Sequence, residues 1–156
     1  MKFAGLWAFF AMIVIIAGCG GGGGSSVTGG GSSGLTGNAE VTGQVVIDGT
    51  ASGIPGVRVL FFDSVGILQA QGTTDANGAY RVVVSPSATA FFVDGSTVNS
   101  SIYYRSFYIG SLTYQYSLPA CKPALPALTA GVSSGNARVD LPLRSDPPPP
   151  PPNGCN

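Results

Sequence analysis

Two stretches decide the fold class of this chain: VTGQVVIDGTASGIPGVRVLFFD at residues 41–63 and TTDANGAYRVVV at residues 73–84. The first begins with apolar or small residues at every second position, as in a strand with one buried face. Further along, Val57, Val59 and Phe61 again share one face. The breakers DGTASGIPG and DANG supply Gly, Pro, Asp and Asn, which favour turns. Both stretches therefore predict short strands joined by tight turns.

The same pattern continues toward the C-terminus. Runs rich in β-branched and aromatic residues alternate with breakers such as SPS and DGSTVN. No window after the first 18 residues has a helical period. Short strands at nearly regular spacing predict an all-β sandwich. The predicted strands are 40–48, 56–63, 80–84, 89–93, 101–109, 112–118 and 137–143.

Three motifs carry a resemblance to a known family: Gly43 in the first strand, PGVRV at 55–59, and TDANGAY at 74–80. Together they resemble the carboxypeptidase regulatory-like domain. The resemblance implies a Greek-key sandwich of the transthyretin (prealbumin) type. It covers residues 39–93 well and residues 137–143 loosely, as a closing strand. Residues 94–136 are longer and richer in Tyr than that family's return, so the sequence leaves their topology open.

The motif residues also have structural roles of their own. Pro55 fixes φ, and Gly56 lets the chain reverse before the second strand. Asp75 is expected to accept backbone N–H bonds in an Asx-type turn, and Gly78 to adopt positive φ. Tyr80 is expected in the core. These residues therefore predict turns and packing rather than chemistry.

The N-terminus predicts export. Lys2 precedes an apolar run that ends near Ala17, shorter than the roughly 20 residues that a membrane-spanning helix needs. The end of the run, IAGC at 16–19, resembles the lipobox of bacterial lipoproteins. The resemblance implies a signal peptide over residues 1–18 and a lipid on Cys19, which would begin the mature chain. An uncleaved membrane anchor is the alternative.

The resemblance to lipoproteins also implies an address. In a two-membrane cell, Gly rather than Asp at position 20 favours the outer membrane, on its periplasmic or surface face. After the lipidated Cys19, residues 20–37 hold ten Gly among eighteen residues. Such a segment predicts a disordered linker with a mean span of about 20–25 Å. The sandwich domain is then predicted at 38–144.

Residues 145–156 form a proline-rich tail with six consecutive prolines. This run predicts polyproline II, a semi-rigid spacer or a frayed tail, and a ligand for a proline-binding module is the alternative. Cys155 follows it. With Cys19 assigned to the lipid, Cys121 and Cys155 would be the remaining pair in an oxidising compartment. The sequence leaves this disulfide open against a free or intermolecular Cys155.

Composition excludes several functions. Seven basic and seven acidic residues give a net charge of +0, so no electrostatic footprint for nucleic acid exists. The chain has no His, which removes imidazole bases, Ser–His and Cys–His pairs and His metal sites. Asp75 and Asn77 alone fall short of a calcium loop. We therefore predict no catalytic residue, no metal, no cofactor and no enzymatic activity.

Tyrosines are the one binding feature in the sequence. Tyr103, Tyr104, Tyr114 and Tyr116 fall on two consecutive predicted strands. Exposed aromatic faces can stack on sugar rings, although aromatic residues in strands mostly serve packing. The leading prediction is a non-catalytic lipoprotein that displays an interaction or structural domain to a protein or glycan partner. The alternative is a carbohydrate-binding module that uses these four tyrosines.

Overall fold

The computed structural model of this chain describes residues 35–117 and 120–154. These residues form nine strands and one 3-10 turn, and no α-helix. The elements are β1 Ala39–Ile47, β2 Arg58–Asp63, β3 Leu68–Thr73, β4 Ala79–Val84, β5 Ala88–Val93, η1 Gly95–Thr97, β6 Ser106–Ile109, β7 Leu112–Gln115, β8 Ser133–Gly135 and β9 Val139–Leu141.

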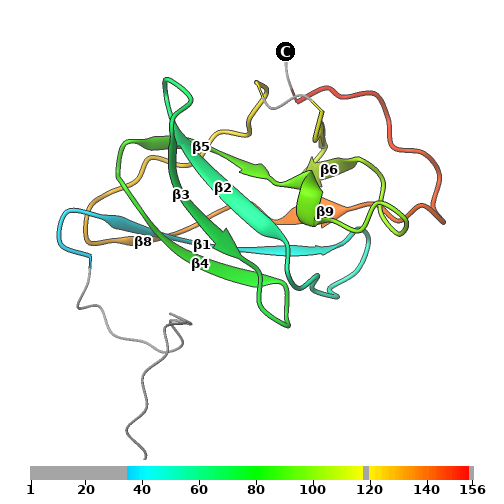
Figure 1. The fold of residues 1–156 in the computed structure, drawn as a ribbon, viewed down its shortest axis with the longest axis horizontal. Helices are drawn as coiled ribbons and strands as arrows, with labels where there is room; N and C mark the ends of the chain where they lie inside the picture. The colour runs from blue at the N-terminus through cyan, green and yellow to red at the C-terminus, as the bar shows by residue number, and fades with distance from the viewer. Residues whose placement is uncertain (1–34, 118–119, 155–156) are drawn as a thin grey trace, which may run out of the picture. The chain divides into compact units, whose positions relative to one another are not determined.

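The strands build two sheets that face each other (Figure 1). The larger has the order β4-β1-β9-β6-β7, with β8 also paired to β1, and the smaller has the order β3-β2-β5. β1 organises the larger sheet because it pairs antiparallel with β4 along one side and parallel with β8 and β9 along the other. The prediction of an all-β, sandwich-like fold is confirmed at this level.

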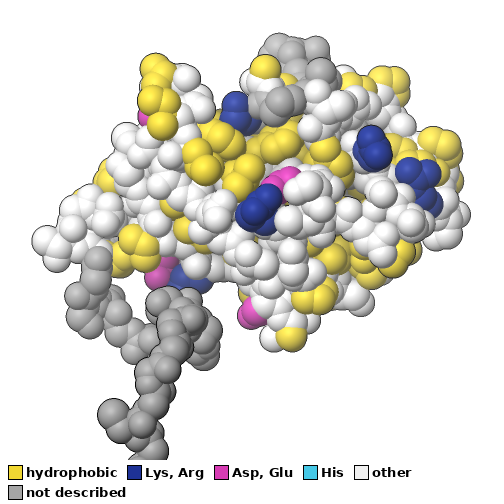
Figure 2. Space-filling model, in the orientation of Figure 1, with side chains coloured by type: hydrophobic (Ala, Val, Ile, Leu, Met, Phe, Trp, Pro, Cys, Tyr) yellow, Lys and Arg dark blue, Asp and Glu magenta, His cyan; other side chains and the backbone are white. Residues whose placement is uncertain are grey.

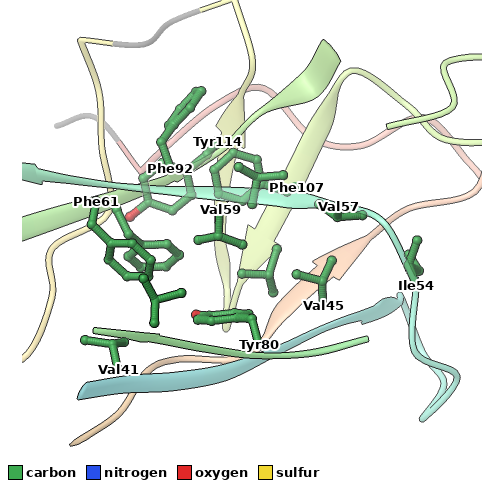
Figure 3. Close-up of a cluster of buried hydrophobic side chains, with 14 of the residues drawn as sticks. Val41, Val45, Ile54, Val57, Val59, Phe61, Tyr80, Phe92, Phe107 and Tyr114 are labelled. Atoms are coloured by element: carbon green, nitrogen blue, oxygen red, sulfur yellow. The ribbon is translucent and has the colours of Figure 1, made fainter. Parts of the chain in front are cut away.

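The core lies between the sheets and is made mainly by alternate residues of strands such as β2, β4 and β9. Val59 and Phe61 of β2 point inward and are fully buried, as the alternation predicts. The Phe61 and Tyr80 rings, from opposite sheets, lie 6.2 Å apart (Figure 3). Val46, on the opposite face of β1 from Val45, is also buried because the turn after β1 folds back onto it through the bridge to Gly53.

The motif turns have the predicted structure. Asp75 Oδ1 accepts the N–H groups of Asn77 at 2.8 Å and Ala79 at 3.0 Å, an Asx-type turn. Gly78 has φ of 72°, which a residue with a Cβ rarely adopts. Tyr80 is buried, and its hydroxyl accepts a 2.8 Å hydrogen bond from Asn136 Nδ2. The predicted turn and core roles are therefore confirmed.

Two strands were not predicted. β3 pairs with β2 along its whole length, yet its sequence LQAQGT carries two glutamines and no alternation of buried residues. Among the described residues β3 pairs with β2 alone, so it is an edge strand of the smaller sheet. An edge strand is held by its backbone hydrogen bonds, so its side chains can be polar and exposed to solvent. β8 has three residues and joins β1 through backbone pairing and one side-chain hydrogen bond, from Ser133 Oγ to Glu40 Oε1 at 2.7 Å. Its sequence SSG has no buried apolar residue that a pattern could reveal.

The proline-rich tail returns to the larger sheet (Figure 1). Thr113 of β7 donates its N–H to Asn153 Oδ1 at 2.7 Å. Its carbonyl accepts the N–H groups of Asn153 and Gly154 at 3.2 and 3.1 Å. The tail therefore covers the outer edge of β7 with a short stretch of backbone pairing.

The predicted signal peptide, Cys19, most of the predicted linker, and Cys155 lie outside the described residues. Within residues 35–117 and 120–154, no helix is long and apolar enough to cross a membrane.

Candidate functional site

An open hollow of about 620 Å³ lies on the outer face of the smaller sheet. Its floor is apolar and consists of Leu60 and Phe62 from β2 and Phe92 from β5. Figure 2 views this face and shows hydrophobic side chains gathered over β2 and β5, with acidic and basic side chains beside them. The volume is within the range of small-ligand sites.

The floor exists because β2 and β5 are apolar on both faces. Leu60 pairs with Phe92 across the two strands, so both point away from the core side that Phe61 and Phe91 fill. Phe92 meets Phe107 edge to face at 5.6 Å. Tyr116 stacks on the same Phe107 ring at 5.5 Å. Through Phe107 these rings join the main core, and Phe92 and Tyr116 expose their outer sides to the hollow.

One side of the hollow is formed by the turn after β5. Asp94 caps η1 by accepting the Ser96 N–H at 2.9 Å, and Arg58 Nε donates to its other carboxylate oxygen at 2.8 Å. Burial alone would raise the pKa of the Asp94 carboxyl. Hydrogen bonds from Ser96 and Arg58, together with the Arg58 charge, outweigh it and hold this pKa below its ordinary value. Asp94 is therefore an anchored anion and not a proton donor at neutral pH.

Two further cations adjoin the apolar floor. Arg105 lines the hollow and its side chain is exposed. Lys122 Nζ lies 4.6 Å from the centroid of the Phe62 ring, a cation–π contact. The surroundings thus combine one paired carboxylate with basic groups over an apolar base.

The structure separates the four predicted tyrosines. Tyr104 and Tyr116 line the hollow. Tyr114 is a core residue, stacked on Phe107 at 5.3 Å and only 5% exposed (Figure 3). Tyr103 packs against the core, and its backbone forms an isolated antiparallel β-bridge with Leu143. The four side chains therefore do not form one exposed aromatic platform, although two of them meet at the same hollow.

Burial leaves little reactive chemistry in these phenols. Desolvation raises the pKa of Tyr103, Tyr114 and Tyr116. The Tyr116 hydroxyl is buried, without a hydrogen-bond partner among the described residues. Such phenols stay neutral at physiological pH, so they serve packing and shape rather than nucleophilic attack.

Within the described part of the chain, no three His, Cys, Asp or Glu side chains are grouped as a metal site would need. Cys121 takes part in a disulfide. The other two cysteines, Cys19 and Cys155, lie outside the described residues. The predicted pairing of Cys121 with Cys155 thus stays a prediction.

The sequence analysis missed the floor of the hollow. A signal for it was present: in RVLFFD at 58–63 and TAFFV at 89–93 the apolar residues are consecutive, not alternating. A strand that is apolar on both faces indicates cover on both faces. The Arg58–Asp94 pair joins residues 36 positions apart, which no local pattern announces.

Comparison with models of known protein families finds none that matches this chain. A search of curated proteins finds no match either.

Proposed function

We propose that this chain is a bacterial lipoprotein, held in the outer membrane by a lipid on Cys19, that displays a non-catalytic ligand-binding sandwich. The observation that carries the binding role is the apolar hollow on the outer face of the smaller sheet, with Arg105, Lys122 and the Arg58–Asp94 pair around it. A purely structural domain would not need a concave apolar site with both acidic and basic groups around it.

The finer fold type is part of the proposal. The TDANGAY turn and the PGVRV entry to β2 occur in the two-sheet setting that a carboxypeptidase regulatory-like domain of transthyretin-like, Greek-key type would need. That module accompanies a separate catalytic domain in metallocarboxypeptidases. The charged groups at the hollow agree with a non-catalytic role, since Asp94 is engaged by Arg58 and Ser96.

The anchor has a direct test. Mass spectrometry of the membrane-extracted protein should find acylated Cys19 as the first residue. Cys19→Ala should leave the signal uncleaved or the protein mislocalised. A soluble mature chain that starts elsewhere would refute the anchor.

The binding role is tested by capture of ligands from glycan and peptide arrays with the purified lipoprotein in detergent. Phe62→Ala and Arg105→Ala should abolish a specific signal, because the first removes an aromatic ring from the floor and the second removes a rim cation that has no ion pair among the described residues. Arg138→Ala is the matched control, since Arg138 bonds Asp140 and the Thr50 carbonyl and does not line the hollow. Equal loss in all three variants would contradict the assignment.

Carbohydrate is the second candidate ligand class, favoured by Tyr104 and Tyr116 at the hollow beside Ser96, Ser100 and Ser117. Aromatic walls with hydroxyl neighbours suit a sugar ring. Tyr104→Ala is the informative variant, because Tyr114→Ala would disturb the core instead. Sugar binding that Tyr104→Ala leaves intact would count against this candidate.

A further inference from the structure

The turn between β2 and β3 exposes apolar side chains where polar ones are usual. Val65 is 77% exposed and Ile67 60%, the two largest exposures among the described large hydrophobic side chains, and Leu68 beside them is 48% exposed. Figure 2 shows hydrophobic side chains projecting at the corner of the molecule where Figure 1 places this turn. Contiguous exposed apolar surface of this kind marks an interaction site.

The turn is held in one shape by Asp63. Its Oδ1 accepts the N–H groups of Val65 at 3.0 Å and Ile67 at 2.8 Å, and its Oδ2 accepts Gln69 Nε2 at 2.8 Å. Gly66, with φ of 85°, closes the turn. The carboxylate thus spends its hydrogen-bonding capacity on the turn itself. The tip presents apolar side chains at little further cost in conformational entropy.

The tip lies at the end of the sandwich where the chain enters from its N-terminus. Ala39 begins β1 opposite Val84, the last residue of β4. The next turn leads to Ala88, which pairs with Asp63 at the base of the exposed tip. The start of β1 and the β2–β3 turn therefore share one end, on the same side of Figure 1.

We propose that this tip inserts into the lipid bilayer that holds the protein, so that the anchored domain stands in one orientation. The inference rests on the proposed lipid anchor at Cys19. A linker of eighteen residues spans about 20–25 Å on average, which keeps the tip within reach of the same bilayer. Tethering raises the effective concentration of lipid at the tip, so three aliphatic side chains suffice.

The lipid class follows from the charge at the tip. The turn's own charged side chain is Asp63, and its oxygens are engaged by the turn. The neighbouring Glu40 is paired with Arg81 at 3.3 Å. With no excess of basic groups among these residues, insertion is driven by apolar burial at the headgroup–acyl boundary, about 5–10 Å deep. Zwitterionic lipid is sufficient.

Tryptophan fluorescence tests this in the full lipoprotein reconstituted into phosphatidylcholine vesicles with brominated acyl chains. The chain's single Trp is Trp7, within the predicted signal peptide, so Val65→Trp would supply the one tryptophan of the mature protein, excited at a wavelength that tyrosine does not absorb. Ile102→Trp is the matched control: Ile102 is 46% exposed and its carbonyl accepts the Arg144 N–H, beyond the opposite end of β1.

The inference expects blue-shifted emission and strong bromine quenching for Val65→Trp, with solvent-like, unquenched emission for Ile102→Trp. Replacing Ile67 and Leu68 by Ser in the Val65→Trp background should reduce the quenching. Vesicle-bound protein with both probes unquenched overturns tip insertion and leaves the anchor standing. Blue-shifted Val65→Trp that bromine does not quench indicates contact with a second protein copy, and also overturns it. Protein that does not bind vesicles contradicts the anchor itself.

Discussion

Thr74 shows how one buried hydroxyl holds a turn in place. Its Oγ1 accepts the Val57 N–H at 2.9 Å and donates to the Ile54 carbonyl at 2.7 Å. Both bonds lie at the entry to β2 and are buried. Thr74 thus links the two stretches that define the fold through two buried side-chain hydrogen bonds.

Thr74→Val should lower the free energy of unfolding by about 2–4 kcal/mol, because it leaves a buried donor and a buried acceptor unpaired. Thr73→Val is the control, since the adjacent Thr73 is exposed and such changes are usually within about 0.5 kcal/mol. Urea denaturation of both variants measures the difference. Similar midpoints for the two variants would contradict the role of the Thr74 hydroxyl.

Tyr80 predicts how stability depends on alkaline pH. Burial raises the pKa of Tyr80 to about 12, partly opposed by the hydrogen bond from Asn136. Because the folded-state pKa is above the unfolded value near 10, the fold favours the neutral phenol. This contribution is complete below about pH 10. It is lost as pH rises from about 10 toward 12, which amounts to about 3 kcal/mol.

Tyr80→Phe should flatten the fall of unfolding free energy in that window. At neutral pH it should cost about 1 kcal/mol for the lost hydrogen bond. Denaturant titrations at several alkaline pH values measure both effects. Some decline will remain in the variant, because burial also raises the pKa of Tyr114 and Tyr116. A variant that declines as steeply as the parent would show that another group controls the alkaline transition.

At the scale of elements, the sequence predicts strands that bury alternate residues and misses those that do not. β1, β2, β4 and β5 match predicted segments because their inward residues are β-branched or aromatic. β3 and β8 depend on backbone pairing with a neighbour, which composition does not reveal.

The candidate site, too, was predicted only in part from the sequence. Tyr104 and Tyr116 were predicted as binding residues and both line the hollow. Tyr114 was predicted with them but fills the core, because a cross-strand partner, Phe107, covers its ring. Whether an aromatic strand residue meets solvent or another ring depends on what packs above it, and that partner is remote in sequence. The hollow itself arises where β2, β5 and the segments around Arg105 and Tyr116 meet, and these parts are distant from one another in the sequence.

The tail contact on β7 can be tested at this scale. Asn153→Ala removes the side chain that accepts the Thr113 N–H. We expect hydrogen exchange at Thr113 to become about five- to tenfold faster, corresponding to the loss of about one hydrogen bond. Ser145→Ala, an exposed change earlier in the tail, should leave the rate unchanged. Unaltered protection of Thr113 in Asn153→Ala would mean that the tail does not protect the β7 edge.

The described domain carries its two proposed contact surfaces, the hollow and the apolar tip, on different parts of the fold. The hollow lies on the outer face of the smaller sheet, and the apolar tip lies at the end where the chain enters. A domain seated on lipid through that end would keep the outer face of the smaller sheet exposed beside the membrane. Membrane contact and ligand binding would then depend on different residues: apolar ones such as Val65 at the tip, and charged ones such as Arg105 at the rim of the hollow.

The predicted disulfide between Cys121 and Cys155 acts on the same whole-molecule scale. Asn153 and Gly154 already bond β7, and Cys121 is disulfide-bonded. Closing the loop between the two positions, which are 34 apart in the sequence, would constrain the unfolded chain and stabilise the domain by about 3–4 kcal/mol. Non-reducing peptide mapping should recover the 121–155 link, and Cys155→Ser should lower the melting temperature accordingly. Asn153→Ala should lower the free energy of unfolding much less while the disulfide is intact than in the Cys155→Ser background. The reason is that the disulfide and the Asn153 hydrogen bond hold the same segment of the tail. Equal costs of Asn153→Ala in both backgrounds would show that the disulfide does not secure this segment.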